Sequence, residues 1–336
     1  MEKEGGLVFK LRRTTSFVLI IGFCVLLDSG LTPAADKVKV AIPSLTLDVS
    51  PWWIGVDQGF FKQEGLDVEV TYISGNTRTV QALLSGEVQA GAGGAAAPAA
   101  AVLRGAKVIV VSVAKNVMDY VLVSKEVVKK PEDLNNKKIA VSAIGGSSHV
   151  AAVMALRAAG ADPNTATMIQ VGGSSARIAA VHKGSVFAAP VSGTVFAGRG
   201  EEYGLQKIVD LAEKGIAYPY DTLFTSRAFA TKNEKTVLGL IKGIVRSIRF
   251  FYDNKEQSLA IAAKKLRNPE TAVLNREWEY VTRNNILQKV PYPTKEGFEA
   301  LFKGMAIENP KATSLRMDDV VDVTYLDKLK SSGFFK

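Results

Sequence analysis

From residue 37 onward, short apolar runs alternate with segments of helical periodicity. The first series predicts strands at 37–42, 66–73, 88–92 and 107–114, with a helix between each strand and the next. The alternation restarts near residue 138, and from residue 234 the pattern is helical. Because a strand–helix–strand order produces a mostly parallel sheet covered by helices, we predict an α/β protein.

A weak internal repeat indicates that the two series form two lobes. Residues 82–90 align with residues 180–188, and each segment follows a turn of glycine and hydroxyl or amide residues that opens a helix. Each half therefore contains a strand that ends in a polar turn, a helix, a glycine turn and a buried strand. A chance likeness between two α/β units is the alternative interpretation.

Residues 1–35 are predicted to be a signal peptide. Lys10, Arg12 and Arg13 precede an apolar run at 17–27 that is too short to span a bilayer, and small residues follow it up to Ala35. The pattern predicts a periplasmic or otherwise extracytoplasmic protein. An uncleaved anchor or a buried helix is the alternative interpretation of this segment.

The chemistry available to the mature chain is limited. Cys24, the only cysteine, lies within the apolar run, so the exported protein would have no disulfide, no cysteine-ligated zinc and no thiol nucleophile. His149 and His182 are the only histidines and lie far apart in the sequence. Phosphate-loop, nucleophile-elbow and dinucleotide-binding motifs are also missing from the sequence. We therefore predict no metal, no cofactor and no catalytic residue.

The chain carries a formal net charge of +9, from 42 lysines and arginines against 33 aspartates and glutamates. These basic residues are spread along the C-terminal helical patterns, without the interleaved aromatic residues that are typical of a nucleic-acid surface. The distribution predicts no nucleic-acid partner and a mild preference for anionic small molecules.

Polar turns follow nearly every predicted strand, at the sheet edge where α/β proteins bind ligands. Glycines there let the backbone approach a ligand, and free N–H groups at helix starts attract anions. The candidate ligand-binding residues are Ser44, Trp52, Asn76, Thr77, Gly93, Gly94, Ser147, Ser148, Ser174, Arg177 and Ser192. The alternative is that the serines and Asn76 only cap helices, that Trp52 lies in the core and that Arg177 is solvent-exposed.

One segment resembles a known family. Residues 51–69 contain Gly59-Phe60-Phe61, then Glu64-Gly65-Leu66 and Val68, which is similar to the opening of the nitrate/sulfonate/thiamine-pyrimidine family of ABC-transporter substrate-binding proteins. Supporting likenesses continue through 82–88, 131–141, 145–149 and 172–174, so the resemblance covers about residues 37–250. Gln89 and Phe187 stand where the family often has aspartate, so ligand identity does not transfer.

The resemblance implies a type II periplasmic-binding fold, with two lobes joined by two crossing strands. Each lobe would be a mixed, mostly parallel sheet flanked by helices. We expect the crossings at 119–124 and 222–226, lobe 1 at 36–118 and 227–336, and lobe 2 at 119–226.

The resemblance also implies a monomeric, non-catalytic protein that binds a small anionic or heterocyclic molecule in the cleft between its lobes and delivers it to an ABC permease. Two alternatives stay open. One is an enzyme on the same fold, such as a lyase or dehydratase of a carboxylated metabolite, for which His149 is the best acid–base candidate. The other is the sensing component of a signalling system.

Overall fold

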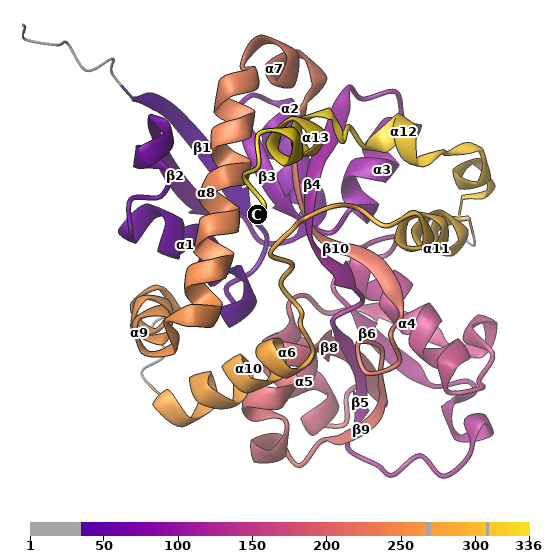
Figure 1. Ribbon diagram of the computed structural model, residues 1–336. Helices are drawn as coiled ribbons and strands as arrows, with labels where there is room; N and C mark the ends of the chain where they lie inside the picture. The colour runs from indigo at the N-terminus through magenta and orange to yellow at the C-terminus, as the bar shows by residue number, and fades with distance from the viewer. Residues whose placement is uncertain (1–34, 267–269, 307–308) are drawn as a thin grey trace, which may run out of the picture. The chain divides into compact units, whose positions relative to one another are not determined.

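The computed structural model describes residues 35–266, 270–306 and 309–336, which form two five-stranded sheets with helices packed around them (Figure 1). In the first sheet the order is β2-β1-β3-β10-β4, with β1, β2 and β3 parallel and β10 antiparallel to both neighbours. These strands are β1 (Asp36–Ile42), β2 (Leu66–Tyr72), β3 (Ala90–Gly93), β4 (Val108–Val117) and β10 (Ala217–Ser226).

In the second sheet the order is β7-β6-β8-β5-β9, with β6 parallel to β7 and β8, and β5 antiparallel to β8 and β9. These strands are β5 (Tyr120–Ser124), β6 (Lys138–Val141), β7 (Thr167–Gln170), β8 (Ala188–Ser192) and β9 (Gln206–Asp210). Two mixed sheets flanked by helices confirm the predicted fold class.

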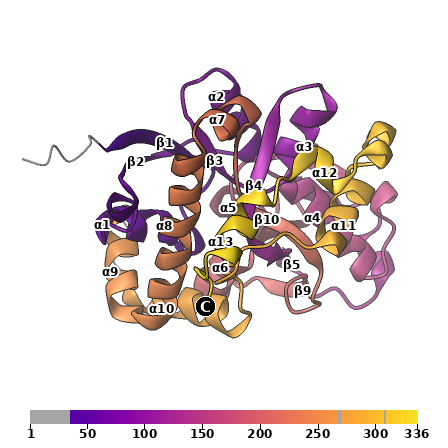
Figure 2. The same ribbon diagram turned by 45° about the horizontal axis from the view of Figure 1, so that its top comes forward.

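Helices cover both sheets, as the rotated view shows (Figure 2). Around the first sheet lie α1 (Ser50–Asp57), α2 (Asn76–Leu84), α3 (Ala96–Leu103), α7 (Arg227–Lys232), α8 (Glu234–Asp253), α9 (Lys255–Leu266), α11 (Lys295–Met305), α12 (Met317–Val320) and α13 (Thr324–Ser331). Around the second lie α4 (Ser147–Ala158), α5 (Ser174–His182), α6 (Gly193–Arg199) and α10 (Thr271–Arg283).

The segment that carries the family resemblance is a compact corner between α1 and β2. Gly59 follows the end of α1 and has a positive φ of 70°. Glycine adopts this conformation without steric cost. Phe61 then turns inward, is buried, and stacks on Trp52 at 5.9 Å between ring centroids. Glu64 pairs with Lys242 at 3.0 Å and with Arg246 at 2.6 Å, both on α8. The motif therefore attaches the corner between α1 and β2 to α8, the longest of the described helices.

The chain passes between the sheets at two places. Between β4 and β5 only Met118 and Asp119 intervene, so this passage overlaps the expected crossing at 119–124 only at Asp119, because Tyr120–Ser124 form β5 of the second sheet. The return lies between β9 and β10, because Ala217 already pairs with Val117 in the first sheet. The expected second crossing at 222–226 is therefore wrong, since those residues form the central part of the first sheet.

The C-terminal part of the chain does not belong to one lobe alone. Leu274, Tyr280 and Val281 of α10 pack into the core of the first lobe, and α10 also packs on α6 of the second. The structure places β10 in the first sheet. The predicted boundaries of the two lobes otherwise stay predictions.

In the described ranges, no helix is both long and apolar enough to cross a membrane. The predicted signal peptide falls outside these ranges, except for its last residue, Ala35.

Candidate functional site

The two lobes meet at the first turns of α2 and α4. Asn76, the first residue of α2, donates from Nδ2 to Ser147 Oγ at 3.2 Å and accepts from the backbone N–H of Gly94 at 3.2 Å. Asn76 and Gly94 belong to the first lobe and Ser147 to the second. These residues follow β2, β3 and β6, so the contact lies where the carboxyl ends of strands from both sheets converge.

Two glycines make this approach possible. Gly93 has a φ of 131°, and a Cβ at Gly93 would overlap the Asn76 side chain. A Cβ at Gly94 would overlap Ser147 Oγ. The side chains of the predicted residues Asn76 and Ser147 therefore fill the space that Gly93 and Gly94 leave open.

Arg177 is a buried cation on α5, only 2% exposed. Its Nε donates to Pro190 O at 2.8 Å, Nη2 donates to Ser174 Oγ at 3.1 Å, and Nη1 donates to Gly172 O. No acidic side chain pairs with this guanidinium in the part of the chain that the structure describes. Burial lowers the pKa of Arg177 because the charged form loses its hydration. Its positive charge is therefore compensated only by neutral groups.

A cluster of four charged residues lies where the chain crosses between the lobes: Asp48, Lys115, Asp119 and Asp221. Lys115 is 1% exposed; it pairs with Asp48 and lies 3.8 Å from Asp119. Asp221 is its partner in the pairing of β10 with β4. We call these four residues the charged cluster.

Burial sets the protonation tendencies in the charged cluster. It raises the pKa of Asp119 and of Asp221, an effect that the Lys115 charge opposes. It also lowers the pKa of Lys115, against the attraction of Asp119 and Asp221. Asp48 Oδ1 and Asp119 Oδ1 are buried and have no hydrogen-bond partner among the described residues. Three carboxyl groups thus share one ammonium group in a poorly hydrated site.

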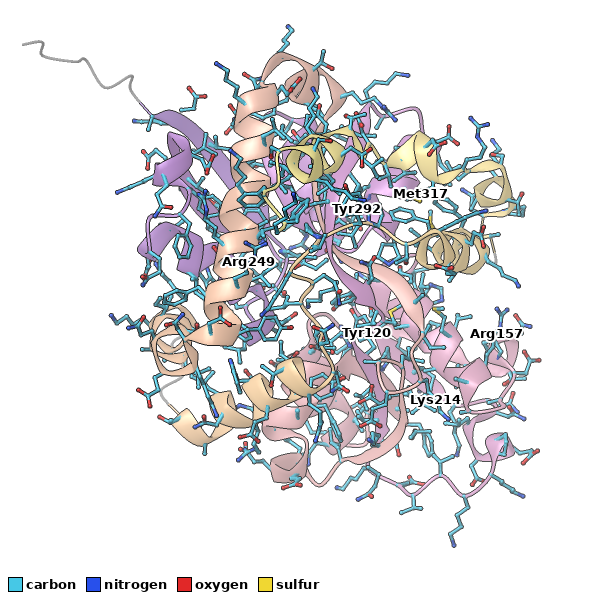
Figure 3. All side chains as sticks on the ribbon, viewed as in Figure 1. Tyr120, Arg157, Lys214, Arg249, Tyr292 and Met317 are labelled. Carbon is cyan, nitrogen blue, oxygen red and sulfur yellow. The ribbon has the colours of Figure 1, made fainter. Side chains whose placement is uncertain are left out.

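The charged cluster is connected to the second lobe. Ser192 Oγ and Thr194 Oγ1 donate to Asp119 Oδ2 at 3.4 Å and 3.3 Å. Lys115 Nζ lies 4.8 Å from the ring centre of Tyr220, which meets Tyr120 edge-to-face at 5.2 Å. Tyr120 opens β5 and lies near the middle of the view in Figure 3, where the sheets meet.

Helix α10, which also packs into the core of the first lobe, contacts α6 and β9 of the second lobe. Arg276 Nε donates to Gly198 O at 3.1 Å, and Tyr280 Oη donates to Asp210 at 3.3 Å. Glu277 is buried against Gly198. A Cβ placed on Gly198 would lie 2.7 Å from Glu277 Oε1. Burial raises the pKa of Glu277 to about 8, against the attraction of nearby arginines.

The other predicted site residues are engaged elsewhere. Ser148 Oγ accepts from Ser142 N at 2.7 Å within the second lobe, so it braces its own loop. Ser44 Oγ lies 3.4 Å from Thr46 Oγ1, and Trp52 is buried in the core against Phe61.

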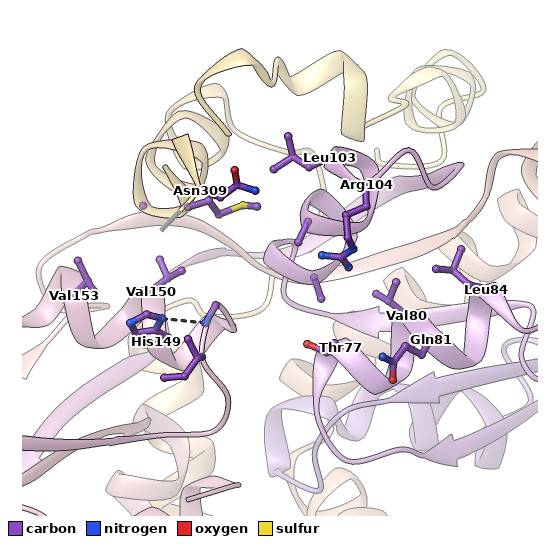
Figure 4. Close-up of a pocket in the computed structure, with 16 residues that line it drawn as sticks. Thr77, Val80, Gln81, Leu84, Leu103, Arg104, His149, Val150, Val153 and Asn309 are labelled. Carbon is purple, nitrogen blue, oxygen red and sulfur yellow. Dashed lines mark hydrogen bonds between the residues drawn. The ribbon is translucent and has the colours of Figure 1, made fainter. Parts of the chain in front are cut away.

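Ser174 and Ser192 are joined to each other, because Ser192 N donates to Ser174 Oγ at 3.1 Å. Thr77 lines a pocket beside the Asn76–Ser147 contact, and so does His149, whose Nδ1 accepts from Gly145 N at 3.0 Å (Figure 4). Across the described ranges, no group of three or more His, Cys, Asp or Glu residues is placed to hold a metal ion.

Comparison with known proteins agrees with this architecture. The family model described as NMT1/THI5 like matches residues 47–258, more than half of the chain. No curated protein matches the sequence.

Several solved structures share the fold. The periplasmic aliphatic sulphonate-binding protein SsuA from Escherichia coli is 19% identical, with a TM-score of 0.68 over 84% of this chain and 91% of that chain. The alkanesulfonate-binding SsuA from Xanthomonas axonopodis pv. citri, bound to MOPS, is 16% identical, with a TM-score of 0.69 over 87% and 99%. The periplasmic nitrate-binding protein NrtA from Synechocystis PCC 6803 is 14% identical, with a TM-score of 0.71 over 89% of each chain.

At these identities the structural likeness establishes the two-lobed periplasmic-binding fold, and the family model establishes kinship. The resemblance of residues 51–69 to the substrate-binding family is thereby confirmed. The chain belongs to the NMT1/THI5-like family.

Proposed function

We propose that this protein is an extracytoplasmic solute-binding protein that captures a small anionic or heterocyclic molecule between its lobes and delivers it to an ABC importer. The observation that carries the proposal is the meeting of Asn76 with Ser147, one from each lobe, at the carboxyl ends of the strands. A molecule that contacts both lobes there binds the closed form better than the open form, and this difference drives closure. The fold relatives that bind sulphonates and nitrate support the same role.

The surroundings of Arg177 favour an anionic group on the ligand. The partners of this guanidinium among the described residues are all neutral, and it lies beside Ser174 at the start of α5, where free backbone N–H groups add positive potential. Ser147 likewise begins α4. An anion between these two helix starts would add a negative charge beside a buried guanidinium whose described partners are all neutral.

Catalysis has less support than binding. The enzyme alternative relies on His149, but its Nδ1 is already engaged by the N–H of Gly145 and braces the turn before α4. This bond holds the ring against the turn. We therefore propose a non-catalytic protein. Mass spectrometry of the best-binding compound after incubation with the protein should show it unchanged, and conversion would refute this part of the proposal.

The test of the main proposal is a thermal-shift screen of sulfonates, aromatic carboxylates, oxyanions and nitrogen heterocycles, followed by calorimetry of the best compound. Ligand at a hundred times its Kd should stabilise the protein by about 2.7 kcal/mol. Ser147→Ala should weaken binding about tenfold, because it removes one hydrogen-bonding group from the closed cleft. The control is Arg249→Ala, a basic residue on α8 (Figure 3).

Small-angle scattering completes the test. A ligand that closes the lobes should lower the radius of gyration at saturation. If none of the compound classes raises the melting temperature, or if Ser147→Ala binds as tightly as the unmodified protein, the proposed site is wrong.

A further inference from the structure

A pocket lies beside the Asn76–Ser147 contact, bounded by α2 and α3 of the first lobe, α4 of the second lobe and α11 (Figure 4). Its volume is about 280 Å³. We call it the side pocket. Among the residues that line it are Leu84, Ala100, Arg104, Ile144, Val150 and Val153. It reaches past the first turns of α2 and α4 to the far end of α3, so most of its wall is separate from the strand ends of the cleft.

The wall of the side pocket is largely apolar, and part of it is unusually exposed. Leu84 is 52% exposed and Ile144 is 53% exposed, which makes them two of the most exposed large apolar residues in the described part of the chain. Val80 is buried in the adjoining core, and Val150 and Val153 present apolar surface from α4. Exposed apolar surface of this kind costs free energy in water and is commonly found where a molecule binds.

Arg104 places a positively charged guanidinium at the side pocket. Among the described lining residues it is the only lysine or arginine, and none of those described residues is acidic. Its side chain has no hydrogen bond or ion pair within the described ranges, and Figure 4 shows it extending from the end of α3 toward Thr77 and Gln81. An unpaired guanidinium above an apolar wall suits a carboxylate that is attached to a hydrocarbon chain.

We propose that the side pocket is a second binding site, for a small amphipathic monoanion whose alkyl chain lies between α2, α3 and α4 and whose carboxylate pairs with Arg104. Since a water molecule occupies about 30 Å³ in the liquid, the volume holds about nine groups of that size, which corresponds to a chain of roughly six to eight carbons. Such a molecule contacts both lobes, so it would also influence closure. The proposal does not depend on the identity of the cleft ligand.

The test is a calorimetric titration of the full exported chain with octanoate. Two probes separate the parts of the argument: acetate has the anion without the chain, and octanol has the chain without the anion. Octanoate should bind, and the other two should bind at least about fivefold more weakly.

Two variants locate the site. Arg104→Gln should weaken octanoate binding about fivefold, since the pair is partly exposed to water. Ala100→Phe should abolish it by filling the pocket from α3, and the melting temperature of that variant checks that it folds. Lys303→Gln is the matched control, because Lys303 is an exposed basic residue on α11 that does not line the pocket.

Three results would overturn the proposal: no octanoate binding at millimolar concentration, equal binding of octanol, or binding that survives both Arg104→Gln and Ala100→Phe. Loss of octanoate binding in Ser147→Ala alone would place octanoate in the cleft. That result would refute the side pocket while supporting the function proposed above.

Discussion

Lys115→Met should be among the most destabilising single substitutions in this protein. The methionine preserves most of the side-chain volume but removes the only ammonium group among Asp48, Asp119 and Asp221. Removal of one partner from a buried ion pair leaves an uncompensated charge and costs about 3–5 kcal/mol. Since Lys115 is almost fully buried, solvent screening does not reduce this figure appreciably. Urea unfolding followed by tryptophan fluorescence measures the loss.

The loss should depend on pH with a definite sign. Burial already raises the pKa of Asp119 and Asp221 in the folded protein above the ordinary value of 3.8, so the folded state binds more protons than the unfolded state above about pH 4. Stability therefore falls as pH rises through this window. Without Lys115 both pKa values rise further, so the deficit of Lys115→Met should be larger at pH 8 than at pH 5.

A second variant separates charge from packing. Asp48→Asn in the Lys115→Met background removes one of the uncompensated carboxylates, so the double variant should be more stable than Lys115→Met alone. A loss below about 1 kcal/mol for Lys115→Met, a deficit that does not change between pH 5 and pH 8, or additive single and double variants would each refute this account of the charged cluster.

The remaining predictions concern the contact of α10 with α6. Glu277→Gln should flatten the pH dependence of stability. Because its pKa is raised to about 8, Glu277 makes the wild type lose stability as pH rises from about 4.5 to about 8. Unfolding measured from pH 5 to 9 checks this, with Glu279→Gln, at an exposed position of the same helix, as the control. Gly193→Ala should cost about 1–3 kcal/mol, because its Cβ would overlap Tyr280 Oη, whereas Gly173→Ala has free space around it and should change the melting temperature little.

The fold was predictable because it depends on local patterns that repeat. Apolar runs of strand length, separated by helical patterns, predicted both sheets and most of their strands. The second crossing could not be placed in this way, because β10 runs continuously from Ala217 to Ser226 and nothing in its own residues tells which sheet it joins. Its pairing with β3 and β4 is a long-range property that the local pattern does not carry.

The candidate site was predictable only as far as strand ends determine it. The rule that ligands bind beyond the carboxyl ends of strands predicted a common location for Asn76, Gly94 and Ser147, and the structure brings these three residues together. The rule does not determine which way a side chain points. It therefore could not separate Ser147, which reaches across to the other lobe, from Ser148, which bonds within its own loop.

The sequence also contains a signal for the charged cluster, and it lies inside a strand and not in a turn. Lys115 follows an almost wholly apolar stretch of β4, and a lysine in a strand buried on both faces requires anionic partners, since an isolated buried charge is too costly to persist. The spacing of residues could not identify those partners, because Asp48 lies 67 positions away and Asp221 faces Lys115 only through the antiparallel pairing of β10 with β4. A charged residue inside a predicted central strand therefore indicates a buried ionic site before its partners are known. Here that site coincides with the crossing between the lobes, because β4 ends at Val117, two residues after Lys115, and the first crossing follows at Met118.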